Sequence, residues 1–205
     1  MLAVEGLACR RGGRLVFEAV SFTLEAGDAL VLSGANGSGK TSLLRLLAGF
    51  ARPAEGSVTW LGREITLEPA EHAQRVHFLG FADGVEGQLS VRENLAYQAA
   101  LLGGGADTVD TALAAFDLAE FAPRPARELS AGQRRRVALA RLLAVPRPLW
   151  LLDEPGVALD RANRARLEAA IERQREEGGL VVVATHGDVR VRDPLVLELG
   201  EPNPC

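Results

Sequence analysis

The chain has 205 residues, a length that suits one domain with a full hydrophobic core. Its formal net charge of −4 gives no basic face for nucleic acid, so we expect no nucleic-acid partner. Although 47% of the residues are apolar, no run approaches the roughly 18 apolar residues that a membrane-spanning helix needs.

Short strands separated by turns are predicted along the first 80 residues. The N-terminal stretch 1–7 reads as a first strand, and Glu5 does not fit a secretory signal, so we expect a cytoplasmic protein. Further strands are predicted at 21–24, 57–60 and 76–79. Cys9 and Cys205 lie far apart without metal-ligand spacing, and we expect both to be inert thiols.

A phosphate-binding loop is predicted between the first buried strand and the first helix. Residues 29–33 form a short apolar run suited to a buried strand, and residues 41–48 have helical apolar spacing that ends at Gly49. The segment between them, Gly34-Ala-Asn-Gly-Ser-Gly-Lys-Thr41, has the glycine, lysine and hydroxyl spacing of a P-loop. Backbone N–H groups at a helix N-terminus make an anion site.

Lys40 is the only lysine among the 23 basic residues of the chain. A compact ammonium group enters a ring of backbone N–H groups and reaches phosphate oxygens, whereas a planar guanidinium is too wide for such a nest. The Thr41 hydroxyl is placed to hold Mg²⁺. We therefore predict that this segment binds a nucleotide phosphate through Gly34, Ala35, Asn36, Gly37, Ser38, Gly39, Lys40, Thr41 and Ser42.

A helical insertion is predicted at about 84–145. Ser90 and Glu93 form a capping box that starts a helix running toward Leu102, where three glycines end it. Ser130 and Gln133 form a second capping box, whose helix presents N–H groups and a positive dipole end. The arginines at 134–136 are expected to be solvated charge.

Carboxylates follow the apolar run Leu149-Trp-Leu-Leu, which we predict to be a buried strand. Asp153 is expected to bind the coordination shell of Mg²⁺. Glu154 is expected to polarise a water in line with the γ-phosphate. A charged surface helix over 161–177 and a strand over 180–184 follow, and His186 stands just beyond that strand.

The segment Leu129-Ser-Ala-Gly-Gln133 resembles the signature of ATP-binding cassette (ABC) ATPases, usually Leu-Ser-Gly-Gly-Gln. The turn after Asp153, ending in Ala-Leu-Asp160, resembles the loop that crosses the ABC dimer interface. The resemblance implies an α/β P-loop NTPase core with an antiparallel β region and an inserted helical subdomain, all in one domain. It implies a homodimer in which Ser130, Ala131, Gly132 and Gln133 of one chain meet the ATP of the other, with His186 on the γ-phosphate.

Two positions depart from the ABC pattern. Arg11 stands where most such domains have an aromatic residue that stacks on adenine, and a guanidinium can stack there instead. Ala82 stands where a glutamine usually contacts Mg²⁺ and water, which weakens the link between nucleotide state and helical subdomain. The adjacent Asp83 is a hypothetical substitute for that glutamine.

The chain also resembles one branch of the ABC ATPases, the ATP-binding subunits of bacterial cytochrome c maturation systems. The segments 79–84, 129–142 and Leu149-Trp-Leu-Leu-Asp-Glu-Pro155 carry this resemblance. It implies ATP and Mg²⁺ as cofactors, and ATP hydrolysis that drives haem export or release of the haem chaperone. It also implies peripheral attachment to the cytoplasmic side of the inner membrane, an integral subunit resembling CcmB and other cytochrome c maturation proteins. By this resemblance, the membrane subunit docks near residues 81–100.

Three other interpretations stay open from the sequence. The chain could serve another ABC exporter or importer, because substrate choice lies in a membrane subunit. A soluble ABC ATPase that acts on ribosomes or DNA usually carries two cassettes or long arms, which this sequence lacks. A nucleotide switch without useful hydrolysis is suggested by Ala82 but opposed by Glu154 and His186.

Overall fold

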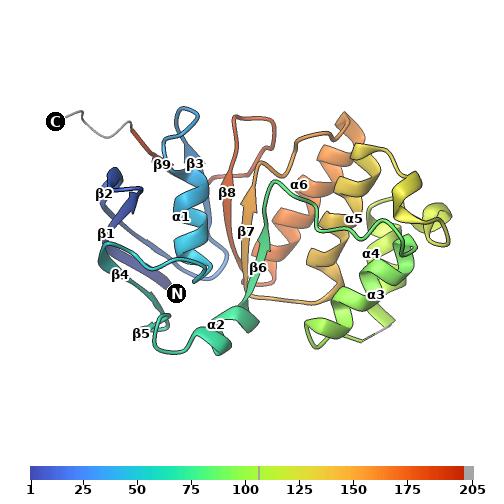
Figure 1. The fold of residues 1–205 in the computed structure, drawn as a ribbon, viewed down its shortest axis with the longest axis horizontal. Coiled ribbons are helices and arrows are strands. Elements are labelled where there is room, and N and C mark those ends of the chain that lie inside the picture. Colours follow the sequence, from blue (N-terminus) through green and yellow to red (C-terminus); the bar gives the residue numbers. More distant parts are fainter. Residues whose placement is uncertain (106, 201–205) are drawn as a thin grey trace.

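The chain folds around two β-sheets with helices between and beside them (Figure 1). The computed structural model describes residues 1–105 and 107–200, so Cys205 lies outside the described residues. One sheet is antiparallel, with the strand order β2-β1-β4-β5, and it confirms the predicted antiparallel β region. Its strands are β1 (Leu2–Arg11), β2 (Arg14–Leu24), β4 (Glu55–Trp60) and β5 (Arg63–Glu64).

The second sheet is parallel, with the strand order β6-β7-β8-β3-β9. Four of its strands were predicted from the sequence, and β9 was not. Because parallel strands end at the same edge of a sheet, the segments that follow β3, β7 and β8 meet there, where open α/β sheets bind ligands. The strands are β3 (Ala29–Ser33), β6 (Val76–Leu79), β7 (Leu149–Asp153), β8 (Leu180–Ala184) and β9 (Leu195–Glu198).

Helix α1 (Lys40–Leu47) packs between the two sheets, α5 and α6 cover the other face of the parallel sheet, and α3 and α4 pack against α5 (Figure 1). Both predicted capping boxes are confirmed, since Ser90 and Ser130 each accept from and donate to the third residue of their helices. No helix in the described part of the chain is both long and apolar enough to span a membrane. The remaining helices are α2 (Pro69–Arg75), α3 (Val91–Leu101), α4 (Asp107–Ala115), α5 (Ala131–Ala144) and α6 (Arg161–Glu176).

The central strand β7 explains why its sequence is a continuous apolar run. Leu149 and Leu151 pack on the α1 side of the sheet, and Trp150 and Leu152 pack on the side of α3 to α6. A parallel strand covered on both faces needs apolar residues at successive positions rather than at alternate ones. This burial holds the end of β7, and with it Asp153 and Glu154, in a fixed place.

The prediction of solvated charge at 134–136 is wrong for two of the three arginines. Arg135 is 3% exposed and Arg136 is 8% exposed. The Arg136 guanidinium donates to the carbonyl oxygens of Phe116 and Asp117 at 3.0 and 2.8 Å, just beyond the end of α4. Carbonyl groups at a helix C-terminus lack partners within the helix and attract cations, so this arginine is a structural cap.

His77 on β6 is a buried structural histidine. Its Nε2 donates to the carbonyl oxygen of Val145 at 2.6 Å, and the side chain is 5% exposed. Burial lowers the pKa of His77 to about 4, and the hydrogen bond to Val145 only partly opposes this shift. The folded protein therefore holds this imidazole neutral at pH values where an unfolded chain would protonate it.

We predict that the His77→Gln variant loses much of the acid sensitivity of folding. Because the folded pKa lies below the unfolded one, the stabilisation is complete above pH 6.5 and is lost as the pH falls toward 4. That loss is about 3 kcal/mol for a shift of this size. Urea unfolding at pH 7 and pH 4 measures it, and an equal pH loss in the variant and the wild type would contradict the prediction.

Candidate nucleotide-binding site

The loop between β3 and α1 leads into an N-terminus of α1 that no side chain caps. Gly39 is the N-cap of α1, with φ of 103°. A Cβ at Gly39 would lie 2.7 Å from Val16 Cγ1 and 2.8 Å from Phe17 Cδ1. Glycine therefore allows both the left-handed turn and the close packing, and the first N–H groups of α1 remain available to an anion.

The Lys40 side chain lies inside this loop. It is 7% exposed, and its Nζ donates to the carbonyl oxygens of Gly34 at 2.7 Å and Ala35 at 3.1 Å. An ammonium group has three N–H donors, so these two bonds leave one donor for a phosphate oxygen. The loop thus holds the positive charge next to its own N–H groups.

Thr41 and Asp153, which lie 112 residues apart in the sequence, bring two hard oxygen ligands together. The Thr41 hydroxyl donates to Asp153 Oδ2 at 2.8 Å, and Asp153 is 6% exposed at the end of β7. Within residues 1–105 and 107–200, no group of three or more His, Cys, Asp or Glu could hold a metal ion. Mg²⁺ keeps several waters and usually binds one or two protein oxygens together with substrate phosphates, so this pair fits an ion that arrives with a nucleotide.

Glu154 and His186 face each other across the ends of β7 and β8. The distance from His186 Nε2 to Glu154 Oε1 is 3.4 Å. The backbone N–H of Glu154 donates to the carbonyl of Ala184 at 2.9 Å, and Glu154 has φ of 47°. Non-glycine residues rarely adopt this left-handed conformation, and such strain is concentrated at functional sites. Glu154 lines the same cavity as the phosphate loop.

Burial raises the pKa of Glu154 above its ordinary value. The nearby charges of Asp188 and Asp153 raise the pKa further, whereas His186 and Lys40 oppose the shift. A carboxylate with a raised pKa is a stronger base. A general base is most effective when its pKa lies near the operating pH. The surroundings of Glu154 therefore favour the abstraction of a proton.

The segment that carries His186 is held by a residue that the sequence analysis did not single out. Thr185 donates from its hydroxyl to the Asp188 carboxylate and accepts from the backbone N–H of Gly187 at 3.2 Å. These bonds fold residues 185–188 into a turn that keeps His186 beside Glu154. A threonine three residues before an aspartate is too common a pattern to have indicated this role.

One cavity of about 270 Å³ gathers most of the predicted site residues. Arg11, at the end of β1, reaches it from the antiparallel sheet. The four signature residues 130–133 are not among its lining residues, and Ser130 and Ala131 are exposed at the start of α5. The cavity is lined by Arg11, Asn36, Gly37, Gly39, Lys40, Thr41, Ser42, Asp153, Glu154 and His186.

Arg135 is the other residue that the sequence analysis missed. Its guanidinium donates to the carbonyl oxygens of Asp153 at 3.2 Å, Glu154 at 2.8 Å and Pro155 at 3.3 Å. Arg135 therefore lies directly behind the strand end that carries the two carboxylates. A signal existed, since the apolar residues Ala138, Leu139 and Leu142 follow it at helical spacing and mark the buried face of α5.

Residues 17–157 match a protein-family model described as ABC transporter. The chain is 51% identical to the "Cytochrome c biogenesis ATP-binding export protein CcmA" of Rhodospirillum rubrum, over 100% of the chain and 88% of that protein. It is 49% identical to the protein of the same name from Paramagnetospirillum magneticum, over 97% of the chain and 94% of the relative.

The fold has a close counterpart among solved structures. A putative ABC transporter ATP-binding protein from Pyrococcus furiosus superimposes with a TM-score of 0.84 at 26% identity. The match covers 97% of this chain and 96% of that one. The predicted α/β P-loop core with an antiparallel region is thereby confirmed.

Proposed function

Since the chain belongs to the ABC transporter family, and within it to the CcmA proteins, we propose that it is the ATP-hydrolysing subunit of a cytochrome c biogenesis export system. The observation that carries this proposal is the single cavity in which Lys40, the Thr41–Asp153 pair and the Glu154–His186 pair meet. ATP hydrolysis would power haem export or release of the haem chaperone. We place the protein on the cytoplasmic side of the inner membrane, attached through a membrane subunit.

The proposed reaction is the hydrolysis of ATP to ADP and phosphate. Lys40 and the N–H groups of the loop bind the phosphates, and Thr41 and Asp153 hold Mg²⁺, which neutralises phosphate charge when bound. A water oxygen bonds to the γ-phosphorus while the bond to the β–γ bridging oxygen breaks, and Glu154 takes the water proton. His186 orients Glu154 and contacts the γ-phosphate. This set of roles supports hydrolysis rather than a passive nucleotide switch.

We propose that two copies of the chain act together. Ser130 and Ala131 are exposed at the capped N-terminus of α5 and lie outside the cavity of their own chain. A helix N-terminus attracts phosphate, so this end is suited to the γ-phosphate of an ATP bound to a second copy. In this arrangement Ser130, Ala131, Gly132 and Gln133 complete the site of the partner chain.

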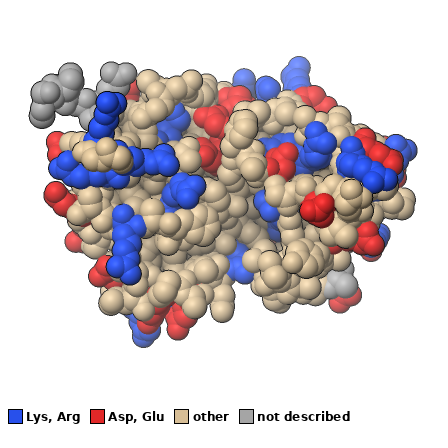
Figure 2. Space-filling model, in the orientation of Figure 1, with Lys and Arg blue, Asp and Glu red and all other residues tan. Residues whose placement is uncertain are grey.

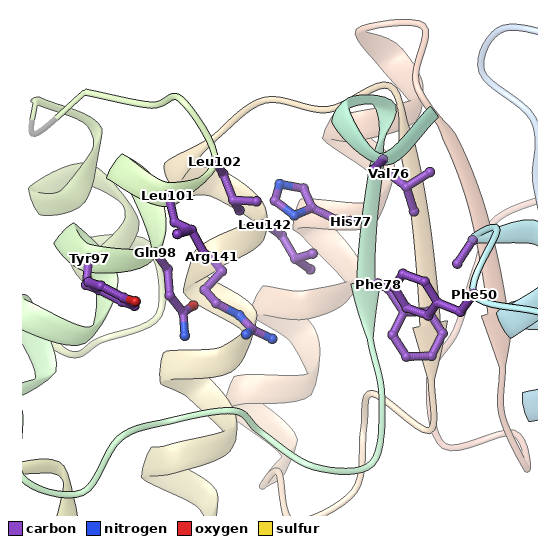
Figure 3. Close-up of a pocket in the computed structure, with 12 residues that line it drawn as sticks. Phe50, Val76, His77, Phe78, Tyr97, Gln98, Leu101, Leu102, Arg141 and Leu142 are labelled. Carbon is purple, nitrogen blue, oxygen red and sulfur yellow. The ribbon is translucent and has the colours of Figure 1, made fainter. Parts of the chain in front are cut away.

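An apolar groove of about 360 Å³ is the proposed docking site for the membrane subunit, which we expect to resemble CcmB. Figure 3 shows Phe50 and Phe78 on one side and Tyr97 and Leu101 of α3 on the other. Phe50, Tyr97 and Leu101 are 59%, 62% and 71% exposed, respectively. In Figure 2, the surface in the lower middle of the molecule is largely uncharged, whereas charged groups lie above it and at the two ends.

Arg141 indicates the chemistry of the segment that enters this groove. Its side chain reaches from α5 into the groove (Figure 3), and burial lowers its pKa. A partly buried guanidinium is stabilised by a carboxylate. We therefore propose that the occupant is a short apolar segment of the membrane subunit that carries an acidic residue.

Affinity purification from bacterial membranes, with native partners retained, tests the proposed function. The wild-type chain should recover a CcmB-like subunit together with haem-handling proteins. A Leu101→Glu variant should lose that subunit, because it places a charge in the apolar groove, while a Leu67→Glu variant should retain it. Leu67 is a matched control, since it is 77% exposed and lies outside the groove. Recovery of a different permease would keep the ATPase mechanism and overturn the proposed pathway.

A further inference from the structure

Arg135 is a buried cation whose hydrogen-bonding capacity is fully used. All five of its N–H donors have acceptors, because Nε and Nη2 serve the carbonyls of residues 153–155 and Nη1 serves two further groups. Those groups are the carbonyl of Gly80 at 3.0 Å and the carboxylate of Asp83 at 3.1 Å. One planar guanidinium thus binds the strand end of the nucleotide site and the loop after β6.

The loop after β6, residues 80–84, also contacts helix α3, which lines the docking groove. The Gln98 side chain donates to the carbonyl of Gly84 at 2.8 Å, and both Gln98 and Arg141 line the groove. Hydrogen bonds therefore join the Glu154 carbonyl through Arg135 to Gly80 and Asp83, and the backbone of the 80–84 loop continues this path to Gly84 and α3. One end is the backbone of Glu154, the residue that carries the proposed catalytic carboxylate, and the other end is the proposed docking surface.

We propose that Arg135 and Asp83 form the link between the nucleotide site and the docking groove, with Arg135 as a positioning residue for Glu154. This inference rests on the proposed function. Ala82, at the position where the ABC pattern has glutamine, is exposed and does not line the nucleotide cavity. Asp83 does not line that cavity either, so it replaces the glutamine by binding Arg135 rather than the nucleotide.

The burial of the pair makes this link specific. The side chains of Arg135 and Asp83 are 4% and 25% exposed, respectively. Water screens a largely buried, charge-assisted hydrogen bond less than a surface ion pair. Because the guanidinium is planar and rigid, a displacement of the 153–155 carbonyls on nucleotide binding must also move Gly80 and Asp83.

Hydrogen exchange measured on the full chain tests the link. The probe is a non-hydrolysable ATP analogue with Mg²⁺, and exchange is compared in segments 34–44 and 84–101. In the wild type, both segments should gain protection. The Asp83→Ala variant should keep the change at 34–44 and lose the change at 84–101. The Arg135→Lys variant should lose it as well, because one ammonium group cannot span both sets of acceptors.

A matched control comes from the same loop. Glu86→Ala removes an exposed carboxylate that does not contact Arg135, and it should respond as the wild type does. A change of wild-type size at 84–101 in Asp83→Ala would overturn the link, as would no change there in the wild type when 34–44 is protected. If the analogue protects neither segment, the nucleotide-binding proposal fails and the link fails with it.

Discussion

Replacement of Glu154 by glutamine is expected to lower kcat for ATP hydrolysis by roughly 10²- to 10⁴-fold, the range for loss of a general base. ATP affinity should change little, because glutamine keeps the size of the side chain and Lys40 still holds the phosphates. Phosphate release and ATP binding, measured side by side, separate the two effects. Glu176→Gln is a matched control, since it neutralises an exposed carboxylate on α6 that does not line the nucleotide cavity.

The pH dependence of hydrolysis gives the Glu154 prediction a second readout. Burial raises the pKa of Glu154, so the base form is lost at a higher pH than for an ordinary carboxylate. Activity should therefore fall as the pH drops through this raised pKa, and that acid limb should be absent from the residual activity of Glu154→Gln. An identical acid limb in both proteins would assign the limb to another group.

Glu154→Gln should also trap the ATP-bound homodimer, because the γ-phosphate that joins the two chains is no longer removed. Light scattering after gel filtration with ATP and Mg²⁺ measures the mass. If the variant stays monomeric at saturating ATP and retains turnover, both the proposed ATP-bound homodimer and the role of Glu154 are wrong.

The Lys40→Ala variant is expected to bind ATP on the order of 10- to 100-fold more weakly, because a hydrogen bond to a charged group contributes about 1.5 to 3 kcal/mol. Lys40→Arg should be impaired as well, although it keeps the charge. The Lys40 ammonium lies within 2.7 and 3.1 Å of two loop carbonyls, which leaves no space for a guanidinium. Titration with a fluorescent ATP analogue measures both variants.

Arg45→Ala supplies the control for Lys40. Arg45 is also a cation on α1, but it is exposed and does not line the nucleotide cavity. Its removal should leave ATP affinity within twofold of the wild type, because the side chain does not reach the cavity. The fold should also be kept, since surface substitutions change the free energy of unfolding by about 0.5 kcal/mol or less. Wild-type affinity in Lys40→Arg would show that charge alone, rather than the shape of the ammonium group, determines binding.

Local sequence signals predicted the elements that carry the site. The spacing in Gly34–Thr41 specifies a turn and a helix start. Each capping box, at Ser90 and at Ser130, is a pattern of four residues that marks a helix N-terminus. The continuous apolar run of β7 indicated a strand buried on both faces. The edge strand β9 was not predicted because Asp193 and Pro194 precede it and most of its residues are exposed.

Contacts between distant segments could not be predicted in the same way. Arg135 was assigned to solvent because charged residues in a run are usually exposed, yet its acceptors come from residues 80–83 and 153–155. Each of those acceptors is a backbone carbonyl or a loop carboxylate, and none leaves a mark on the sequence around Arg135. The role of Asp83 depends on the same pairing, which only the folded chain defines.

The most direct test of the central claim is covalent haem attachment to periplasmic c-type cytochromes in a bacterial host that lacks its own CcmA gene. Haem staining of separated cytochromes measures attachment. The wild-type chain should restore it, and Glu154→Gln, expressed at the same level, should not. Failure of the wild-type chain, when it is stably expressed together with its native membrane subunit, would contradict a role in cytochrome c biogenesis, as would full restoration by Glu154→Gln.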